Sequence, residues 1–217
     1  MLEVKVCGLT DAAAVAAAAE GGARWLGFVF YPPSRRALSP AQAAPLAALA
    51  PAGCRTVGVL VDPDDAQIEA ILGVVALDAL QLHGAQTPAR VAAIKAATGR
   101  LVIKALSVAE PEDLASVAAY AEVADMLLFD ARPPRDPAAL PGGNGLSFDW
   151  RLLQSLEVTR PWLLAGGLNA ANLASAVRLC GARAVDVSSG VEQRPGCKDP
   201  ARIKEFLALA ATLGVPA

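Results

Sequence analysis

The sequence has a single histidine, His83, and its four cysteines stand far apart with no CxxC pair. Structural and catalytic zinc sites draw on closely spaced cysteines and histidines, so a metal site has poor support here. The same wide spacing gives no support for disulfides. For any one of the four cysteines, a buried and inert thiol is the ordinary interpretation, and only its position can favour another role.

The chain also lacks an excess of charge and a long apolar run. Lys and Arg number 19 against 21 Asp and Glu, and they are scattered, which excludes the basic stripe that nucleic acid or anionic lipid would need. Hydrophobic residues make up 54% of the chain, but charges or glycines interrupt each run before about 18 residues. Glu3 and Lys5 interrupt the start, which argues against a signal peptide. We expect a small-molecule partner, no nucleic acid, no membrane, and a cytoplasmic location.

Short apolar segments alternate with alanine- and leucine-rich stretches of helical period throughout the 217 residues. Ser39, Asp62 and Thr87 each precede a proline and are expected to cap helices. A chain of this length predicts one domain, residues 1–217. The expected strands are residues 4–7, 24–30, 55–61, 77–82, 100–106, 124–130, 161–165 and 183–188.

Strands separated by single crossover helices pair in parallel, in an open or a closed sheet. An open, doubly wound sheet would usually have fewer strands and a GxGxxG turn after the first one, which is absent. Eight repeats of about 25 residues favour a closed α/β barrel, the (β/α)8 or TIM barrel. The irregular segment 131–147, with four prolines and GGNG, is expected to form a mobile lid.

In such barrels the active site lies at the carboxyl ends of the strands. Cys7 and Asp130 end the first and sixth strands, nearly opposite each other. A thiol becomes a base where a cation favours thiolate, and a carboxyl becomes an acid where desolvation favours its neutral form. Lys5, two residues before Cys7, either helps to ionise the thiol or forms an interior ion pair, for example with Asp186 on strand eight.

Two glycine-bearing turns follow strands seven and eight, AGGLN and SSGVE. Barrel phosphate sites are commonly built from these two loops, because glycine lets backbone N–H groups approach an anion. The phosphate-binding candidates are Gly166, Gly167, Ser189 and Gly190.

The loop after strand two carries two neighbouring arginines, Arg35 and Arg36. A guanidinium holds a planar carboxylate by two parallel hydrogen bonds. Residue type alone does not choose between the two side chains, and either could equally be a solvated loop charge.

Taken in order, these motifs resemble the phosphoribosylanthranilate isomerase family of tryptophan biosynthesis over nearly the whole chain. The motifs are VKVCGLT, GFVFYPPSRRALSP, VGVLVD, LDALQLHG, LLFDARP, GGNGLSFDW, LLAGGLNAANL and VDVSSGVEQRPGCKD. The resemblance implies a cofactor-free Amadori rearrangement of N-(5-phosphoribosyl)anthranilate to 1-(2-carboxyphenylamino)-1-deoxyribulose 5-phosphate.

The resemblance also assigns roles. It implies that Cys7 is the general base and Asp130 the general acid, that Arg36 binds the anthranilate carboxylate, and that the glycine turns bind the phosphate. Gln81 and His83, on the QLHG turn, are possible substrate contacts, although a histidine held in structural hydrogen bonds is the preferred alternative. The sequence departs from the family at Pro33 and Arg35 and within the expected lid, where GGNGLSFDW stands for GG[ST]GKTFDW and RPPRDPAALP is longer.

Three alternatives stay open at this point. A ribulose-phosphate epimerase-like enzyme would need metal-binding histidines, and the chain has one. A dual-substrate isomerase of histidine and tryptophan biosynthesis would typically carry aspartates at both positions, whereas strand one ends in cysteine. A catalytically inactive barrel that serves as a binding module is disfavoured because both Cys7 and Asp130 are present.

Overall fold

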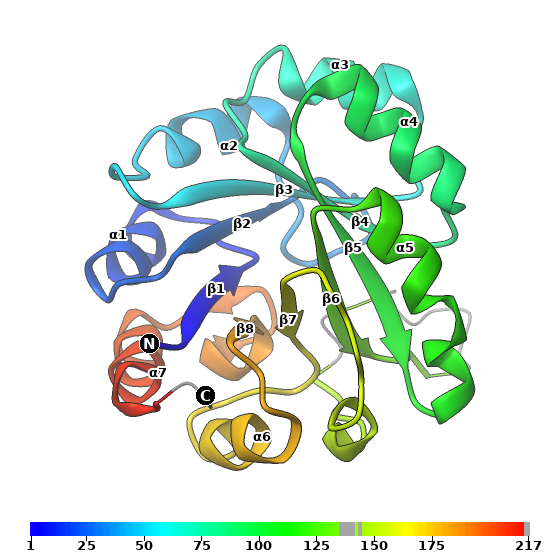
Figure 1. Ribbon diagram of the computed structural model, residues 1–217. Helices are drawn as coiled ribbons and strands as arrows, with labels where there is room; N and C mark the ends of the chain where they lie inside the picture. Colours follow the sequence, from blue (N-terminus) through cyan, green and yellow to red (C-terminus); the bar gives the residue numbers. More distant parts are fainter. Residues whose placement is uncertain (135–141, 143–144, 215–217) are drawn as a thin grey trace.

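The computed structural model describes residues 1–134, 142 and 145–214. Eight parallel strands form a closed barrel in chain order, with the helices around the outside (Figure 1). The strands are β1 (Glu3–Cys7), β2 (Trp25–Val29), β3 (Arg55–Val61), β4 (Ala79–His83), β5 (Leu101–Val108), β6 (Met126–Ala131), β7 (Trp162–Leu164) and β8 (Ala184–Val187). Each expected strand is therefore present, within two residues at its ends, and the (β/α)8 architecture is confirmed.

Among the described residues, six α-helices lie in the crossovers between the barrel strands and a seventh follows β8, while the crossover from β6 to β7 contains a short 3-10 helix, η2 (Trp150–Leu153). The α-helices are α1 (Ala12–Glu20), α2 (Pro40–Ala47), α3 (Asp65–Leu72), α4 (Pro88–Thr98), α5 (Val117–Val123), α6 (Leu173–Cys180) and α7 (Pro200–Thr212). None of the helices in this described part is both long and apolar enough to cross a bilayer.

Three smaller elements lie on the loops at the carboxyl ends of the strands. A 3-10 helix, η1 (Pro111–Ser116), follows β5, and another, η3 (Ser189–Val191), follows β8. Directly after η3, β9 (Glu192–Arg194) and β10 (Cys197–Lys198) form an antiparallel hairpin. The sequence pattern did not predict this hairpin, because its strands are too short to show a period.

The capping residues were predicted in part. Ser39 and Thr87 cap α2 and α4, each accepting a hydrogen bond from the backbone N–H three residues later. The prediction for Asp62 is wrong, because Asp64 caps α3 by accepting from the N–H of Gln67 at 2.7 Å. Asp62 instead has a positive φ of 43° and accepts from the N–H of Ala85 at 2.7 Å, which joins the loops after β3 and β4.

The barrel interior has an apolar lower layer and a more polar upper one. The lower layer consists of buried apolar residues from most of the strands, among them Trp25, Val57 and Ile103. Nearer the carboxyl ends, Cys7 packs against Val29 and Val59. Strands β1 and β8 close the barrel with Lys5 and Asp186 at the same level, so polar groups occupy the interior below the upper rim.

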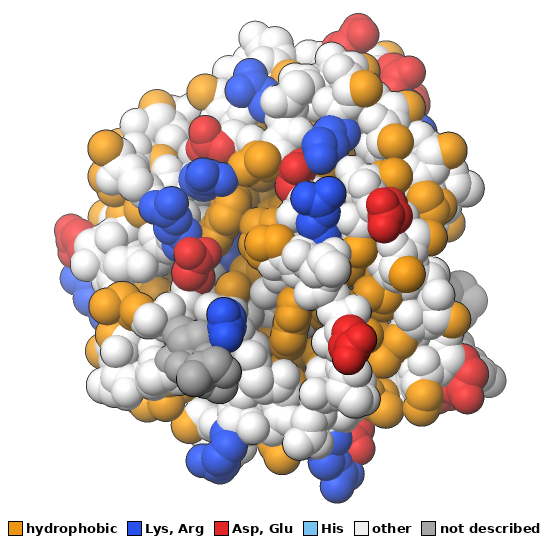
Figure 2. Space-filling view, viewed as in Figure 1, with side chains coloured by type: hydrophobic (Ala, Val, Ile, Leu, Met, Phe, Trp, Pro, Cys, Tyr) orange, Lys and Arg blue, Asp and Glu red, His pale blue; other side chains and the backbone are white. Residues whose placement is uncertain are grey.

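On the face seen in Figure 2, Lys and Arg side chains are interspersed with Asp and Glu side chains. This face therefore carries no continuous patch of one charge. Between the charged side chains, hydrophobic side chains line the hollow at the centre of the view.

Candidate active site

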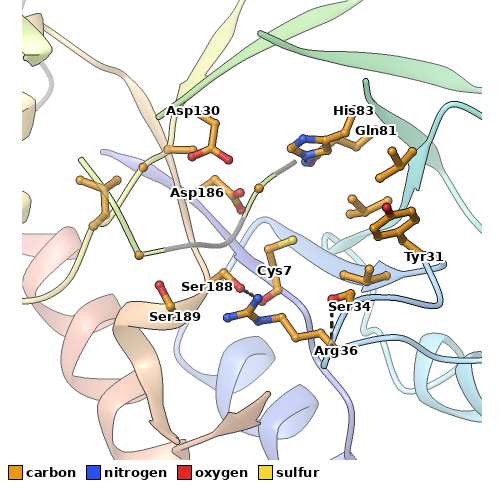
Figure 3. A pocket seen from close by; sticks show the side chains of 18 of the residues that line it. Cys7, Tyr31, Ser34, Arg36, Gln81, His83, Asp130, Asp186, Ser188 and Ser189 are labelled. Carbon is orange, nitrogen blue, oxygen red and sulfur yellow. Dashed lines mark hydrogen bonds between the residues drawn. The ribbon is translucent and has the colours of Figure 1, made fainter. Parts of the chain in front are cut away.

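A cavity of about 740 Å³, part of it open to solvent, lies at the carboxyl ends of the strands. Cys7, Arg36, Gln81, His83, Asp130 and Ser189 line it, as do Gly166 and Gly167 (Figure 3). Eight of the nine residues predicted from the sequence therefore share one cavity. The ninth, Gly190, lies just behind Ser189, and a Cβ atom there would clash with the backbone oxygen of Leu168.

The Cys7 thiol lies beside the Lys5 ammonium. Both side chains approach Gly27 on the neighbouring strand β2, where a Cβ atom would lie 3.1 Å from Sγ of Cys7 and 3.2 Å from Nζ of Lys5. The Lys5 side chain is fully buried and donates a hydrogen bond to Oδ1 of Asp186 at 3.0 Å. The expected interior ion pair is confirmed, and it places one cation next to the thiol.

Burial raises the pKa of Cys7 above its ordinary value, and Lys5 acts in the opposite direction without reversing the shift. Asp186 adds a smaller contribution that raises the pKa further. Lys5 thus favours the thiolate form of Cys7, which is one of the two roles that the sequence suggests for this lysine. In the site without substrate, the thiol form nevertheless predominates at neutral pH.

Asp130 lies at the end of β6 and faces the cavity from the other side (Figure 3). Burial, followed by the negative charge of Asp186, raises the pKa of Asp130 to about 7. One of its oxygens, Oδ1, accepts from the backbone N–H of Ala131 at 2.9 Å. This carboxyl is consequently about half protonated at neutral pH, which suits a proton donor.

Gln81 and His83 point into the same cavity from alternate positions of β4 (Figure 3). Their Nε2 atoms lie 2.7 Å apart. Oε1 of Gln81 is buried and has no hydrogen-bond partner among the described residues. A buried acceptor of this kind is costly unless a ligand satisfies it, so Gln81 is suited to receive a donor group of a bound molecule.

Of the two arginines, Arg36 is buried and lines the cavity, whereas Arg35 is exposed. Gly8 makes room for Arg36, because a Cβ atom at Gly8 would clash with Cδ of the arginine. The guanidinium donates from Nε to Oε1 of Glu192 at 2.7 Å and from Nη2 to Oε2 at 2.9 Å. These two bonds fix the plane of the guanidinium at the wall of the cavity.

The glycine turns after β7 and β8 lie against each other at the cavity, since a Cβ atom at Gly190 would clash with the backbone oxygen of Leu168. Gly166 and Gly167 have positive φ angles of 86° and 64°, which favour glycine. Parts of the expected lid lie here too: the backbone oxygen of Leu146 approaches Gly167, and Gly145 approaches Oγ of Ser189. Residues 135–141 and 143–144 of that segment lie outside the described residues.

Comparison with known proteins agrees with this geometry. The family model described as N-(5'phosphoribosyl)anthranilate (PRA) isomerase matches residues 4–208. The N-(5'-phosphoribosyl)anthranilate isomerase of Paracoccus denitrificans is 58% identical over 209 residues, which are 96% of this chain and 97% of that protein. The chain belongs to this isomerase family.

Solved structures of the isomerase family have the same fold. The enzyme from Thermotoga maritima superposes with a TM-score of 0.87 at 37% identity and covers 98% of this chain and all of its own. A phosphoribosyl anthranilate isomerase in complex with reduced 1-(o-carboxyphenylamino)-1-deoxyribulose 5-phosphate has a TM-score of 0.84 at 36% identity, covering 98% of this chain and 100% of its own.

Sequence reasoning missed several residues around the cavity. Tyr31 and Ser34 line it, and Asp186 lies between Cys7 and Asp130 (Figure 3). Asp186 was considered only as a partner for Lys5, although its position two residues before Ser188 on β8 places it on the inner face. Glu192 had no signal in the sequence, because its hydrogen bonds to Arg36 span 156 positions.

Proposed function

We propose that this isomerase converts N-(5'-phosphoribosyl)anthranilate to 1-(o-carboxyphenylamino)-1-deoxyribulose 5-phosphate by general acid–base catalysis, with Asp130 as the acid and Cys7 as the base. The observation that carries the proposal is the placement of a thiol and a carboxyl of raised pKa in one cavity, at the ends of β1 and β6. A cytoplasmic location and a small-molecule phosphosugar substrate belong to the same proposal.

In the first step, protonated Asp130 gives its proton to the ring oxygen of the ribose. The bond between C1 and the ring oxygen breaks, and the nitrogen lone pair forms a C1=N iminium. In the second step, the Cys7 thiolate removes the proton from C2, and that electron pair forms a C1=C2 double bond as the iminium is neutralised. The resulting enolamine then tautomerises to the ketone, and solvent returns the proton from Cys7 to Asp130.

The charges of the site fit this sequence of steps. Asp130 is able to hold a proton near neutral pH because its pKa is about 7. Cys7 has a raised pKa in the site without substrate, so its ionisation needs a cation in addition to Lys5. The iminium supplies that cation next to the sulfur, whose proton passes to solvent, and it also acidifies the C2–H bond, so a base held within hydrogen-bonding reach suffices.

The binding groups follow from the same cavity. Arg36 would hold the anthranilate carboxylate, since a guanidinium fixed in plane is complementary to it. Backbone N–H groups of the turns at Gly166, Gly167, Ser189 and Gly190 would hold the phosphate. Gln81 would accept a hydrogen bond from a donor of the substrate, which satisfies its buried oxygen.

The test is an assay that follows the loss of substrate fluorescence, with Cys7→Ala and Asp130→Asn as variants. We expect turnover by the wild type and a fall in kcat of at least about 100-fold in each variant, as is usual for loss of a general acid or base. A wild-type chain that binds substrate without turnover would support the binding-module alternative instead. Turnover retained in either variant would remove that residue from the mechanism.

A further inference from the structure

The loop after β4 is held from outside the barrel by a buried lysine of β5, Lys104. The residues on either side of it in the strand pack inside the barrel, so Lys104 points outward, and it is only 1% exposed. Its Nζ atom donates to the backbone oxygens of Leu82 at 3.3 Å and Gly84 at 2.8 Å, and to Oε1 of Gln86 at 2.9 Å. The three hydrogens of the ammonium are therefore all donated to one loop, residues 82–86.

Gln86 extends this network to the backbone of His83. While its Oε1 accepts from Lys104, its Nε2 donates to the backbone oxygen of His83 at 2.8 Å. Tyr120 on α5 donates from its hydroxyl to the backbone oxygen of Gln86 at 2.8 Å, and its ring centre lies 5.6 Å from Nζ of Lys104. Lys104 and Gln86 together thus bind the three successive backbone oxygens of residues 82–84, which fixes the backbone that carries His83.

The charge of Lys104 has no carboxylate partner among the residues that the structure describes, because the three acceptors are uncharged oxygens. Burial lowers the pKa of Lys104 to about 8, and the negative charge of Asp62 opposes this shift. The ammonium form therefore predominates at pH 7 and the neutral amine at pH 9. A neutral amine has only two hydrogens, so one of the three hydrogen bonds to the loop is lost when it forms.

Other titratable side chains share a second pocket with Lys104, on the outer side of the loop. Asp113 among them is itself paired with Arg132. The titratable side chains of this pocket besides Lys104 are Asp62, His83, Asp113 and Tyr120.

On its other side, the loop carries His83 into the active-site cavity (Figure 3). A Cβ atom on Gly142 would lie 3.0 Å from Cε1 of His83 and also 3.0 Å from Oδ2 of Asp130. The imidazole ring and the proposed acid therefore lie on two sides of one small space. A displacement of residues 82–86 would move the ring relative to Asp130 and to any molecule bound between them.

We propose that Lys104 is a positioning residue: by binding the loop 82–86 from outside the barrel, its ammonium holds His83 at the cavity wall in contact with the bound substrate. The inference rests on the proposed function and on the expected contact between His83 and the substrate. Lys104 itself does not line the active-site cavity, so its effect on a bound molecule passes through His83.

The experiment is a double-mutant cycle on the binding of reduced 1-(o-carboxyphenylamino)-1-deoxyribulose 5-phosphate. Titration calorimetry at pH 7 gives its dissociation constant for the wild type, Lys104→Met, His83→Ala and the double variant. Lys95→Met is the matched control, because it removes a lysine of α4, the helix that follows the loop, where Lys95 is paired with Asp125. Near-ultraviolet circular dichroism checks that each variant is folded, and Lys104→Gln takes the same test if the methionine variant is not.

We expect Lys104→Met to raise the dissociation constant at least about fivefold, because a contact made by a displaced group is weakened. The double variant should bind within about twofold of His83→Ala, since the effect of Lys104 passes through the ring that is then absent. Lys95→Met should bind as the wild type does. A wild-type constant in Lys104→Met would overturn the proposal. The same fivefold weakening in the His83→Ala background would also overturn it, because a general loosening of the fold gives that result.

A second readout tests whether the charged form holds the loop. The ratio of the dissociation constants of Lys104→Met and wild type cancels the titration of the ligand and of groups common to both proteins. This ratio should fall between pH 7 and pH 9, as wild-type Lys104 loses its third hydrogen. A ratio of the same size at both pH values would overturn the role of the ammonium.

The outcomes also separate this inference from the proposed function. A wild-type dissociation constant in His83→Ala would overturn the contact at His83 and the role of Lys104 with it. Absence of isomerisation by the wild type in the fluorescence assay would overturn the proposed function. The binding constants are measured without turnover, so they test Lys104 whatever the result of that assay.

Discussion

The thiol of Cys7 and the ammonium of Lys5 lie side by side over Gly27. Each is within about 3.2 Å of the position that a Cβ atom on Gly27 would take. The thiol that we propose as the catalytic base therefore lies beside a cation that favours its ionisation, because Gly27 has no side chain between them. Lys5 in turn is held by Asp186, so the three groups form one buried unit at the closure of the barrel.

Removing the cation should move the titration of the thiol. In Lys5→Met the pKa of Cys7 should rise further, because burial and Asp186 both raise it and Lys5 opposes them. The measurement is the pH dependence of iodoacetamide alkylation at Cys7, followed by peptide mass spectrometry so that the other cysteines are distinguished. Lys204→Met, at an exposed lysine paired with Glu20, is the control. An unchanged profile in Lys5→Met would show that Lys5 has no effect on the thiol.

Filling the space above Gly27 should impair catalysis. In Gly27→Ala the new methyl group would be 3.1 Å from the sulfur and 3.2 Å from the ammonium, which is tighter than ordinary contact. We expect kcat to fall at least about tenfold, because small displacements of reacting groups are costly. Gly214→Ala, at a position with open space around it, should leave kcat unchanged in the same assay. Wild-type kcat in Gly27→Ala would mean that the thiol tolerates displacement.

The raised pKa of Asp130 predicts a pH-dependent cost in stability. An unfolded aspartate loses its proton near pH 4, whereas folded Asp130 keeps it until about pH 7, so the folded state binds more protons in between. The contribution of Asp130 to the free energy of unfolding is therefore fully present at low pH and is lost as the pH rises to about 7. Asp130→Asn has no such cost and should be more stable than the wild type at pH 8, with the advantage growing by about 3 kcal/mol between pH 5 and pH 8.

Urea unfolding of wild type and Asp130→Asn at both pH values measures this difference. Glu112→Gln, at an exposed carboxylate, serves as the control and should show no such growth. A constant difference between wild type and Asp130→Asn would mean that the carboxyl ionises in the folded protein as it does in the unfolded chain.

The raised pKa values of Asp130 and Cys7 also predict the shape of the pH–rate profile. In the proposed mechanism the active form has protonated Asp130 and ionised Cys7. The pKa of Asp130, about 7, lies below that of Cys7, which is raised above its ordinary value. The value of kcat/KM should rise up to about pH 7, stay level above it, and fall only beyond the pKa of Cys7. Initial rates across this range, corrected for spontaneous hydrolysis of the substrate, give the profile. A decline that begins at pH 7 would contradict this order of pKa values.

Much of the fold was predictable because it depends on local pattern. Strands buried on both faces read as short apolar runs, and their regular alternation with helical stretches identified the barrel before any contact was known. The positions of Cys7, Asp130 and the glycine turns were predictable for the same reason, since the order of elements along the chain defines the carboxyl end of each barrel strand.

What escaped prediction depends on contacts between distant parts of the chain. Glu192 and Lys198 look like ordinary surface charges of a hairpin in the sequence, yet the fold buries both beneath Arg36. The choice between Arg35 and Arg36 likewise follows from burial, which residue type does not encode. Asp62 followed the capping pattern and failed because it pairs with the next loop, where a tertiary hydrogen bond outweighs a local preference.

The most direct test is a crystal structure of the protein with reduced 1-(o-carboxyphenylamino)-1-deoxyribulose 5-phosphate bound. The account predicts Sγ of Cys7 within about 3.5 Å of C2, and a carboxyl oxygen of Asp130 within hydrogen-bonding reach of the oxygen that leaves C1. A ligand whose C2 lies far from the sulfur, or whose C4 hydroxyl, the former ring oxygen, faces another proton donor, would contradict it.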